Sequence, residues 1–117
     1  MTKDNSADCD PRTARIRSLN DAFRTMLTGG RIVITQGIQA LTKEQQIAVL
    51  RGVTNFTAFN EDNDPHGERD FGAFDVGGQK VFWKIDYYDK AMEFGSPDPA
   101  DPAQTTRVLT VMKSEEY

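Results

Sequence analysis

The sequence has a single cysteine and no long apolar run, and these absences exclude several classes of protein. Cys9 has no partner for an internal disulfide, and no second thiol is present to build a thiolate metal site. A membrane-spanning helix needs about 18 apolar residues in a row, which the chain lacks. The opening MTKDNSADCD also lacks the apolar segment of a signal peptide. We therefore expect a cytoplasmic protein without membrane contact.

Charge is distributed unevenly along the chain, whose formal net charge is −4. Through Phe56 there are 8 Lys or Arg against 5 Asp or Glu, a net charge of +3, whereas the remainder has 6 against 13, a net charge of −7. The early arginines could form a small basic patch for phosphate groups. The overall acidity and the absence of an interleaved aromatic motif argue against nucleic acid as the main partner. These arginines are Arg12, Arg15, Arg17, Arg24 and Arg31.

Length and polarity predict one domain behind a polar tail. A chain of 117 residues has room for one compact domain. The first residues are polar as far as Pro11, so we expect a disordered tail at residues 1–12 and a single domain at residues 13–117.

Two amphipathic helices are predicted from apolar spacing. The first carries an apolar stripe from Ile16 to Leu27 and is expected to end at Gly29 and Gly30, because glycine readily adopts the left-handed cap conformation. The second covers residues 41–56, where Thr42 and Gln45 have the spacing of a capping box.

Four runs of β-branched and aromatic residues predict strands, namely RIVIT, DFGAFDV, QKVFWKIDYY and TTRVLTVM. The second and third flank two glycines and therefore read as a hairpin. The order α-β-α-β-β-β predicts an α+β fold, with two helices on one face of a mainly antiparallel sheet of about four strands. The predicted core consists of Ile16, Leu19, Phe23, Ile47, Leu50, Val53, Phe74, Val81, Trp83, Ile85, Val108 and Val111.

The segment EDNDPHGERD is rich in oxygen and imidazole ligands. Its aspartates at alternate positions resemble a calcium loop, but Ala73 stands where that loop needs a bidentate Glu. A different metal site could be built from Asp64, His66, Glu68 and Asp70, since imidazole and carboxylates together suit Zn, Mn or Fe. The alternative, which we favour, is a turn-rich loop whose aspartates accept hydrogen bonds from their own backbone, with no metal and no cofactor.

Acid/base chemistry is a further possibility on one strand. Strand alternation places Lys84, Asp86 and Tyr88 on the same face, and Glu68 completes the set that we would assign to catalysis. The competing explanation is ordinary pairing of opposite charges on a solvated sheet, which is worth about 0.2–1 kcal/mol per pair. We favour pairing, because no nucleophile with a partnered base stands out.

The stretch SPDPADP predicts a stiff connector, because each proline fixes its own φ and extends the residue before it. Asp98 and Asp101 are expected either to cap backbone amides there or to bind Arg107. Together with aromatic residues they favour a rigid binding surface for a protein partner. We predict that this surface comprises Asp62, Asp64, Asp70, Tyr87, Tyr88, Asp89, Asp98 and Asp101.

Several long blocks carry a resemblance to a known family: NDPHGERDFGAF, VFWKIDYYD, GSPDPADPAQTTRVLTVM and EEY. From about Ile16 to Tyr117 the chain resembles an uncharacterised family of small, mainly alphaproteobacterial proteins, a domain of unknown function. The family is carried in part on plasmids and other mobile elements. The resemblance implies no activity, but it suggests an accessory role in plasmid upkeep or against host defence, such as an anti-CRISPR factor.

The chain departs from the family pattern at one informative place. The family has a histidine where this chain has Arg69, preceded by an aromatic residue where this chain has His66. A mechanism that depends on that histidine is therefore disfavoured. The positions that fit the family pattern are Asp64, Glu68, Asp70, Lys84, Asp86, Tyr87, Tyr88 and Asp89. We expect a non-enzymatic binding protein, with an enzyme centred on Asp64, Glu68, Lys84 and Asp86 as the alternative.

Overall fold

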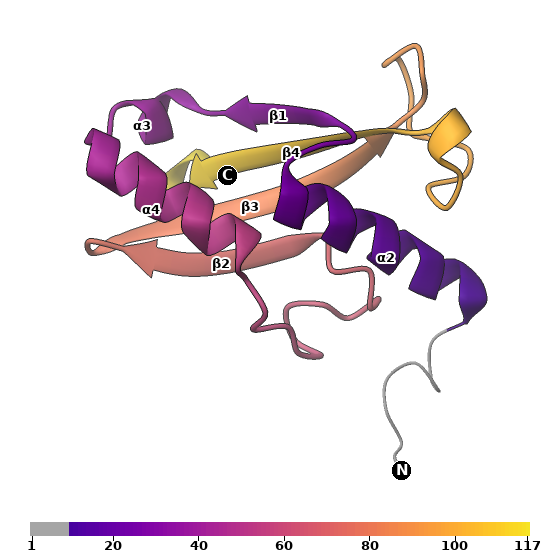
Figure 1. Ribbon diagram of the computed structural model, residues 1–117, viewed down its shortest axis with the longest axis horizontal. Coiled ribbons are helices and arrows are strands. Elements are labelled where there is room, and N and C mark those ends of the chain that lie inside the picture. Colours follow the sequence, from indigo (N-terminus) through magenta and orange to yellow (C-terminus); the bar gives the residue numbers. More distant parts are fainter. Residues whose placement is uncertain (1–9) are drawn as a thin grey trace.

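The computed structural model describes residues 10–117 as a four-stranded sheet with helices packed on one face (Figure 1). The predicted α+β class is confirmed, although the short helix between the first strand and the second long helix is not among the predicted elements. The elements in chain order are α2 (Pro11–Met26), β1 (Arg31–Ile34), α3 (Gln36–Gln39), α4 (Lys43–Thr54), β2 (Phe71–Val76), β3 (Gln79–Tyr88), η1 (Pro102–Gln104), β4 (Thr106–Lys113) and η2 (Ser114–Glu116).

The strands lie in the order β1-β4-β3-β2. β2, β3 and β4 pair antiparallel, and the predicted hairpin joins β2 to β3 through Gly77 and Gly78, both at positive φ. β1 pairs parallel with β4, with Arg31 opposite Val108. The sheet is therefore mixed. β1 and β4 can pair parallel because the helices and two strands between them in sequence provide the long connection that parallel strands need.

The ends of α2 differ from the prediction. The helix begins at Pro11 because the Asp10 carboxylate accepts a hydrogen bond from the Thr13 amide and proline suits the first helical position. It ends at Met26, and Leu27 instead of a glycine takes the left-handed cap conformation. Residues 1–9 of the predicted tail lie outside the described part of the chain.

The helix α4 begins as predicted, since Thr42 and Gln45 form both hydrogen bonds of the capping box. Its buried face is rotated from the predicted one. Val49 and Val53 are completely buried, whereas Ile47 is 51% exposed and was wrongly placed in the core. The close approach of Gly52 to Phe74 explains the rotation, because a side chain at residue 52 would overlap the Phe74 ring.

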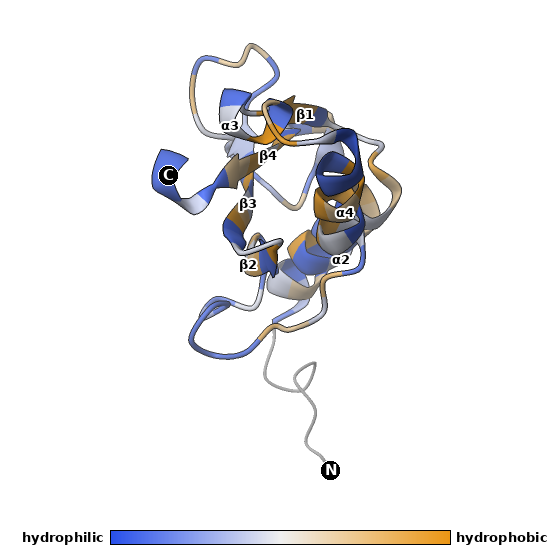
Figure 2. Ribbon diagram, turned by 90° about the vertical axis from the view of Figure 1, so that its left-hand side faces the viewer, coloured by the Kyte–Doolittle hydropathy of each residue, from blue (hydrophilic) through white to orange (hydrophobic). Residues whose placement is uncertain are grey.

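The core lies between the sheet and its helices (Figure 2). Trp83 is fully buried at its centre, with Phe56 and Phe59 packed edge-on against the indole. The predicted core residues Leu19, Leu50 and Phe74 are only half-buried. Buried apolar residues that the prediction did not include are Ile38, Val49, Phe56, Leu109 and Met112.

Among residues 10–117, the opposite face of the sheet, here called the open face, is covered by neither α2 nor α4 (Figures 1 and 2). The short helix η2 and Tyr117 lie beside it, and the Glu116 carboxylate holds η2 in place by accepting hydrogen bonds from the Gly37 amide and the Thr35 hydroxyl. Within residues 10–117, no helix combines the length and apolar character needed to cross a membrane.

Candidate functional site

A buried polar network joins α2 to the sheet and to both acidic loops. Asn20, which is inaccessible to solvent, donates to the Glu68 carbonyl (3.0 Å) and to the Tyr87 hydroxyl (2.8 Å). Its amide oxygen accepts from Arg107 Nε at 2.7 Å. Arg107 in turn donates to the Pro99 carbonyl, so one asparagine connects the loop before β2 with the loop before β4.

Tyr87 is held in this network as a neutral phenol. Its hydroxyl donates to the Glu68 carboxylate at 2.8 Å, and the Arg107 guanidinium lies 5.2 Å from the centre of its ring. Burial raises the pKa of Tyr87 well above its usual value, and the neighbouring Glu68 carboxylate adds to the shift. Tyr87 therefore stays protonated near neutral pH, and its hydroxyl links Asn20 to the Glu68 carboxylate.

A second cluster, of which Arg24 is the buried member, surrounds half-buried Phe59. The Arg24 guanidinium, which is only 3% exposed, donates to the Val53 carbonyl at 2.7 Å and to Asp21 Oδ1 at 3.2 Å. The other carboxylate oxygen of Asp21 accepts from Arg69 at 3.0 Å. Both guanidiniums lie over the Phe59 ring, at 5.4 Å for Arg24 and 5.2 Å for Arg69. This cluster joins α2, the end of α4 and the loop before β2.

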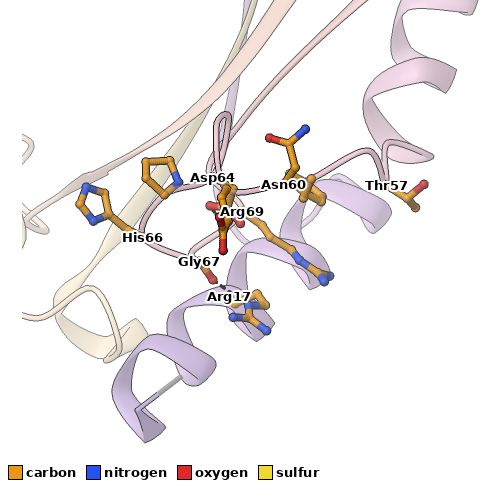
Figure 3. A pocket seen from close by; sticks show the side chains of 10 residues that line it. Arg17, Thr57, Asn60, Asp64, His66, Gly67 and Arg69 are labelled. Carbon is orange, nitrogen blue, oxygen red and sulfur yellow. Dashed lines mark hydrogen bonds between the residues drawn. The ribbon is translucent and has the colours of Figure 1, made fainter. Parts of the chain in front are cut away.

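A hollow of about 470 Å³ lies beside this cluster, between α2 and the loop before β2 (Figure 3). Arg17 and Arg69 reach toward it from opposite walls, and His66 lies at its rim. The Arg17 side chain also donates to the Gly67 carbonyl at 2.7 Å. The remaining lining residues are Thr57, Phe59, Asn60, Glu61, Asp64, Pro65 and Gly67, with none from the 95–103 loop.

The aspartates of the connector before β4 accept hydrogen bonds from their own loop, as one of the two predicted arrangements requires. Asp98 accepts from the Ala100 amide and Asp101 from the Ala103 amide. Neither carboxylate binds Arg107, and Asp98 pairs instead with Arg12 at 3.2 Å. Asp89 caps the preceding turn by accepting from the Glu93 amide. These acids stiffen the loop.

In the loop before β2, polar side chains likewise accept hydrogen bonds from backbone amides of their own loop. Asn60 accepts from the amides of Asp62 and Asn63, and Asp64 accepts from the Arg69 amide at 3.0 Å. Asp70 is half-buried, and this burial raises the pKa of its carboxyl. Over residues 10–117, no three His, Cys, Asp or Glu side chains come close enough to share a metal ion, so Asp64, His66, Glu68 and Asp70 do not gather as a metal site.

The structure brings together some of the residues assigned to catalysis and separates others. Lys84 and Asp86 form an ion pair of 2.9 Å on the open face of the sheet, and Tyr88 follows on the same face. The Asp86 carboxylate raises the pKa of Lys84. Glu68 lies on the helix-covered side, where it accepts from Tyr87. The set therefore does not line one cavity.

An aromatic cluster on the open face was not predicted. The rings of Phe71 and Phe82 lie edge-to-face at 5.2 Å, and Tyr117 packs on both, at 6.3 and 5.6 Å. Tyr117 is 75% exposed. Strand alternation shows that Phe82 faces away from Trp83, but it gives no indication that a residue from the chain end returns to it.

Asn20 and Arg24 were likewise missed, because their positions on a surface-like helix suggest solvent exposure. The sequence gives one indication of their burial. Asn20 directly follows Leu19 and Arg24 directly follows Phe23, so both lie near the edge of the apolar stripe of the helix.

Comparison with known proteins places the chain in a family without assigning it an activity. No curated protein and no solved structure matches the chain. The model of the family described as "Protein of unknown function (DUF3768)" matches residues 34–116. The match covers the sheet from the last residue of β1 onward, both acidic loops and α4, while α2 precedes it. Since most of the sequence is matched, the chain belongs to the DUF3768 family.

Proposed function

We propose that this protein is a non-enzymatic accessory domain that binds a protein partner through the open face of its sheet. The observation that carries the proposal is the aromatic cluster of half-buried Phe71 and Phe82 with exposed Tyr117, on the face of the sheet opposite to α2 and α4. Aromatic side chains with a fixed backbone are frequent anchors of protein interfaces. Lys84, Asp86 and Tyr88 extend this surface along β3.

The rigidity of the surroundings supports binding over catalysis. Asp64, Asp98 and Asp101 accept hydrogen bonds from backbone amides of their own loops, so these carboxylates stiffen the surface. The enzyme alternative requires Asp64, Glu68, Lys84 and Asp86 to share a cavity, whereas the Lys84–Asp86 pair lies across the sheet from the contact between Glu68 and Tyr87. A partner meets a preformed surface and need not order it.

Because the chain resembles proteins that are carried on mobile elements, we also propose where it acts. A small accessory factor of a plasmid would act on a host or plasmid protein, either against a defence system or in plasmid maintenance. Retention of a plasmid with and without the gene, over generations without selection, tests this setting separately from the binding surface.

The binding proposal is tested with two exposed aromatic residues. Tyr117→Ser removes one ring of the cluster, while Phe94→Ser removes a ring that is similarly exposed, at 71%, in the loop after β3. Neither ring contributes to the core, so both variants should fold. Proteins crosslinked to the tagged chain in its native host are identified by mass spectrometry. A partner that is lost with Tyr117→Ser and retained with Phe94→Ser supports the proposal, and identical partner lists for all three proteins contradict it.

A further inference from the structure

Two hollows lie between α2 and the segment that follows α4, and Arg69 lines both; the two together are called the groove below. The hollow of about 470 Å³ shown in Figure 3 adjoins a second one of about 500 Å³, and both are lined by Thr57, Phe59 and Arg69. The second hollow is also lined by Asp21 and Arg24 of α2. The groove is separate from the aromatic cluster on the open face, because α2 packs on the other side of the sheet.

Positive charge at the middle of this groove is only partly balanced. The single carboxylate of Asp21 contacts two guanidiniums, Arg24 at 3.2 Å and Arg69 at 3.0 Å, so the group of three carries a net charge of +1. Arg24 Nε is buried and has no hydrogen-bond acceptor within residues 10–117. A buried or half-buried guanidinium gains most from an acceptor that carries charge.

The Arg69 side chain is positioned to bind a negatively charged acceptor. Its backbone is held at φ 56°, a conformation that is unfavourable for a residue with a side chain, and the hydrogen bond from its amide to Asp64 fixes it there. Only one terminal nitrogen of the guanidinium, Nη1, has an acceptor in the described chain. The edge formed by Nε and Nη2 is the edge that binds a carboxylate with two parallel hydrogen bonds. The side chain is 37% exposed and lines both hollows.

The surrounding residues limit the ligand to a small monoanion with an apolar body. Phe59 provides an apolar ring directly beneath the Arg69 guanidinium. Glu61 and Asp64 line the same groove and repel a second negative charge, while Arg17 on the opposite wall is held by the Gly67 carbonyl. We propose that the groove binds the carboxylate group of a small organic acid or of a peptide C terminus, through the free edge of Arg69 and against the Phe59 ring.

Titration followed through the arginine Nε–H signals in ¹⁵N NMR spectra tests this proposal, with benzoate as the probe. Saturable movement of the Arg69 signal with a Kd of about 1 mM or tighter is expected. Arg69→Gln, whose titration is followed through the Nε–H signals of Arg17 and Arg24 in the same groove, should weaken benzoate binding at least tenfold, about the effect of 1.4 kcal/mol. The control Arg51→Gln removes an exposed arginine of α4 outside the groove and should leave the Kd unchanged. Thermal unfolding of both variants establishes that they are folded.

Further probes distinguish the source and the charge of the ligand. Phe59→Leu should weaken benzoate more than acetate, because only benzoate has a ring to place beside residue 59. The tripeptide Gly-Gly-Phe with a free C terminus is compared with its amidated form: tighter binding of the free form than of benzoate assigns a peptide terminus, and the reverse order assigns a small acid. The proposal is overturned if the Arg69 signal does not saturate, if Arg69→Gln binds benzoate as well as the unmodified chain, if the amidated peptide binds as well as the free form, or if inorganic phosphate binds more tightly than benzoate.

Discussion

The buried network around Asn20 gives the most demanding prediction for the stability of this fold. Asn20→Ala removes one hydrogen bond to a guanidinium, from Arg107 at 2.7 Å, and two to neutral groups, Glu68 carbonyl and Tyr87 hydroxyl. A bond to a charged group contributes about 1.5–3 kcal/mol and each neutral one about 1 kcal/mol, so the free energy of unfolding should fall by about 3.5–5 kcal/mol. This is a large share of the 5–15 kcal/mol typical of a small domain.

Equilibrium unfolding in urea measures this loss. The unfolding midpoint of Asn20→Ala should fall while the dependence on urea stays the same, since the surface exposed on unfolding is unchanged. Asn55→Ala, which alters an exposed asparagine at the end of α4, is the matched control and should change the free energy of unfolding by less than about 0.5 kcal/mol. Equal stability of the Asn20→Ala and Asn55→Ala chains would refute the reasoning.

Asn20→Asp separates the contributions within the network. Aspartate keeps an oxygen for Arg107 but cannot donate to the Glu68 carbonyl or to the Tyr87 hydroxyl. Combining Asn20→Ala with Tyr87→Phe in a double-mutant cycle isolates the bond between these two side chains, and a coupling energy of about 0.5–3 kcal/mol is expected for residues in one network. A coupling energy of zero would mean that the 2.8 Å contact contributes nothing.

Three further predictions concern packing, pH and the chain end. Gly52→Ala should destabilise the fold by up to about 2 kcal/mol in thermal or urea unfolding, because overlap with the Phe74 ring outweighs the gain of about 1 kcal/mol in helix propensity, and a more stable variant would contradict this. Burial raises the pKa of the Asp70 carboxyl above its ordinary value of 3.8, so the free energy of unfolding should fall as the pH rises from 3.8 through the raised pKa. The difference in stability between Asp70→Asn and the unmodified chain should appear only above pH 3.8. A difference that does not depend on pH would contradict this. Glu116→Gln should speed hydrogen exchange at the Gly37 amide by weakening the carboxylate contact at 2.9 Å, with the Ala100 amide as an unaffected internal reference.

Local chemistry made much of the fold predictable. The capping box at Thr42, the paired glycines of the hairpin and the alternation along β3 each specify a local structure that the protein adopts. The rotation of α4 was not predictable, because Ile47 and Val49 have equal claims to burial by spacing. The contact between Gly52 and Phe74, which lies across two elements, decides between them.

The parallel pairing of β1 with β4 was also beyond the sequence. RIVIT and TTRVLTVM read as strands from their composition, but their mutual direction depends on where the intervening helices return the chain. Local propensity contains no information on that path, because it is set by tertiary packing.

The candidate sites also differ in whether local sequence or tertiary packing determines them. For Asp98 and Asp101 the sequence left two arrangements open, backbone capping and a contact with Arg107, and the structure shows the capping. The groove around Arg69 could not be predicted from the sequence. It depends on Arg24 being buried between Phe59 and Trp83, and a single arginine on an amphipathic helix gives no sign that its charge is turned inward.

The use of the acids on backbone amides has a consequence for where binding takes place. A carboxylate that already accepts from an amide of its own loop has fewer acceptor sites left for a partner, and its orientation is fixed by the loop. Two features do not depend on these acids: the Tyr117 ring, packed on Phe82 on the open face, and the edge of the Arg69 guanidinium that has no acceptor in the described chain, on the helix side. They lie on opposite sides of the sheet, so Tyr117→Ser should leave benzoate binding unchanged and Arg69→Gln should leave partner capture unchanged. Loss of both properties in either variant would mean that the two surfaces form a single site.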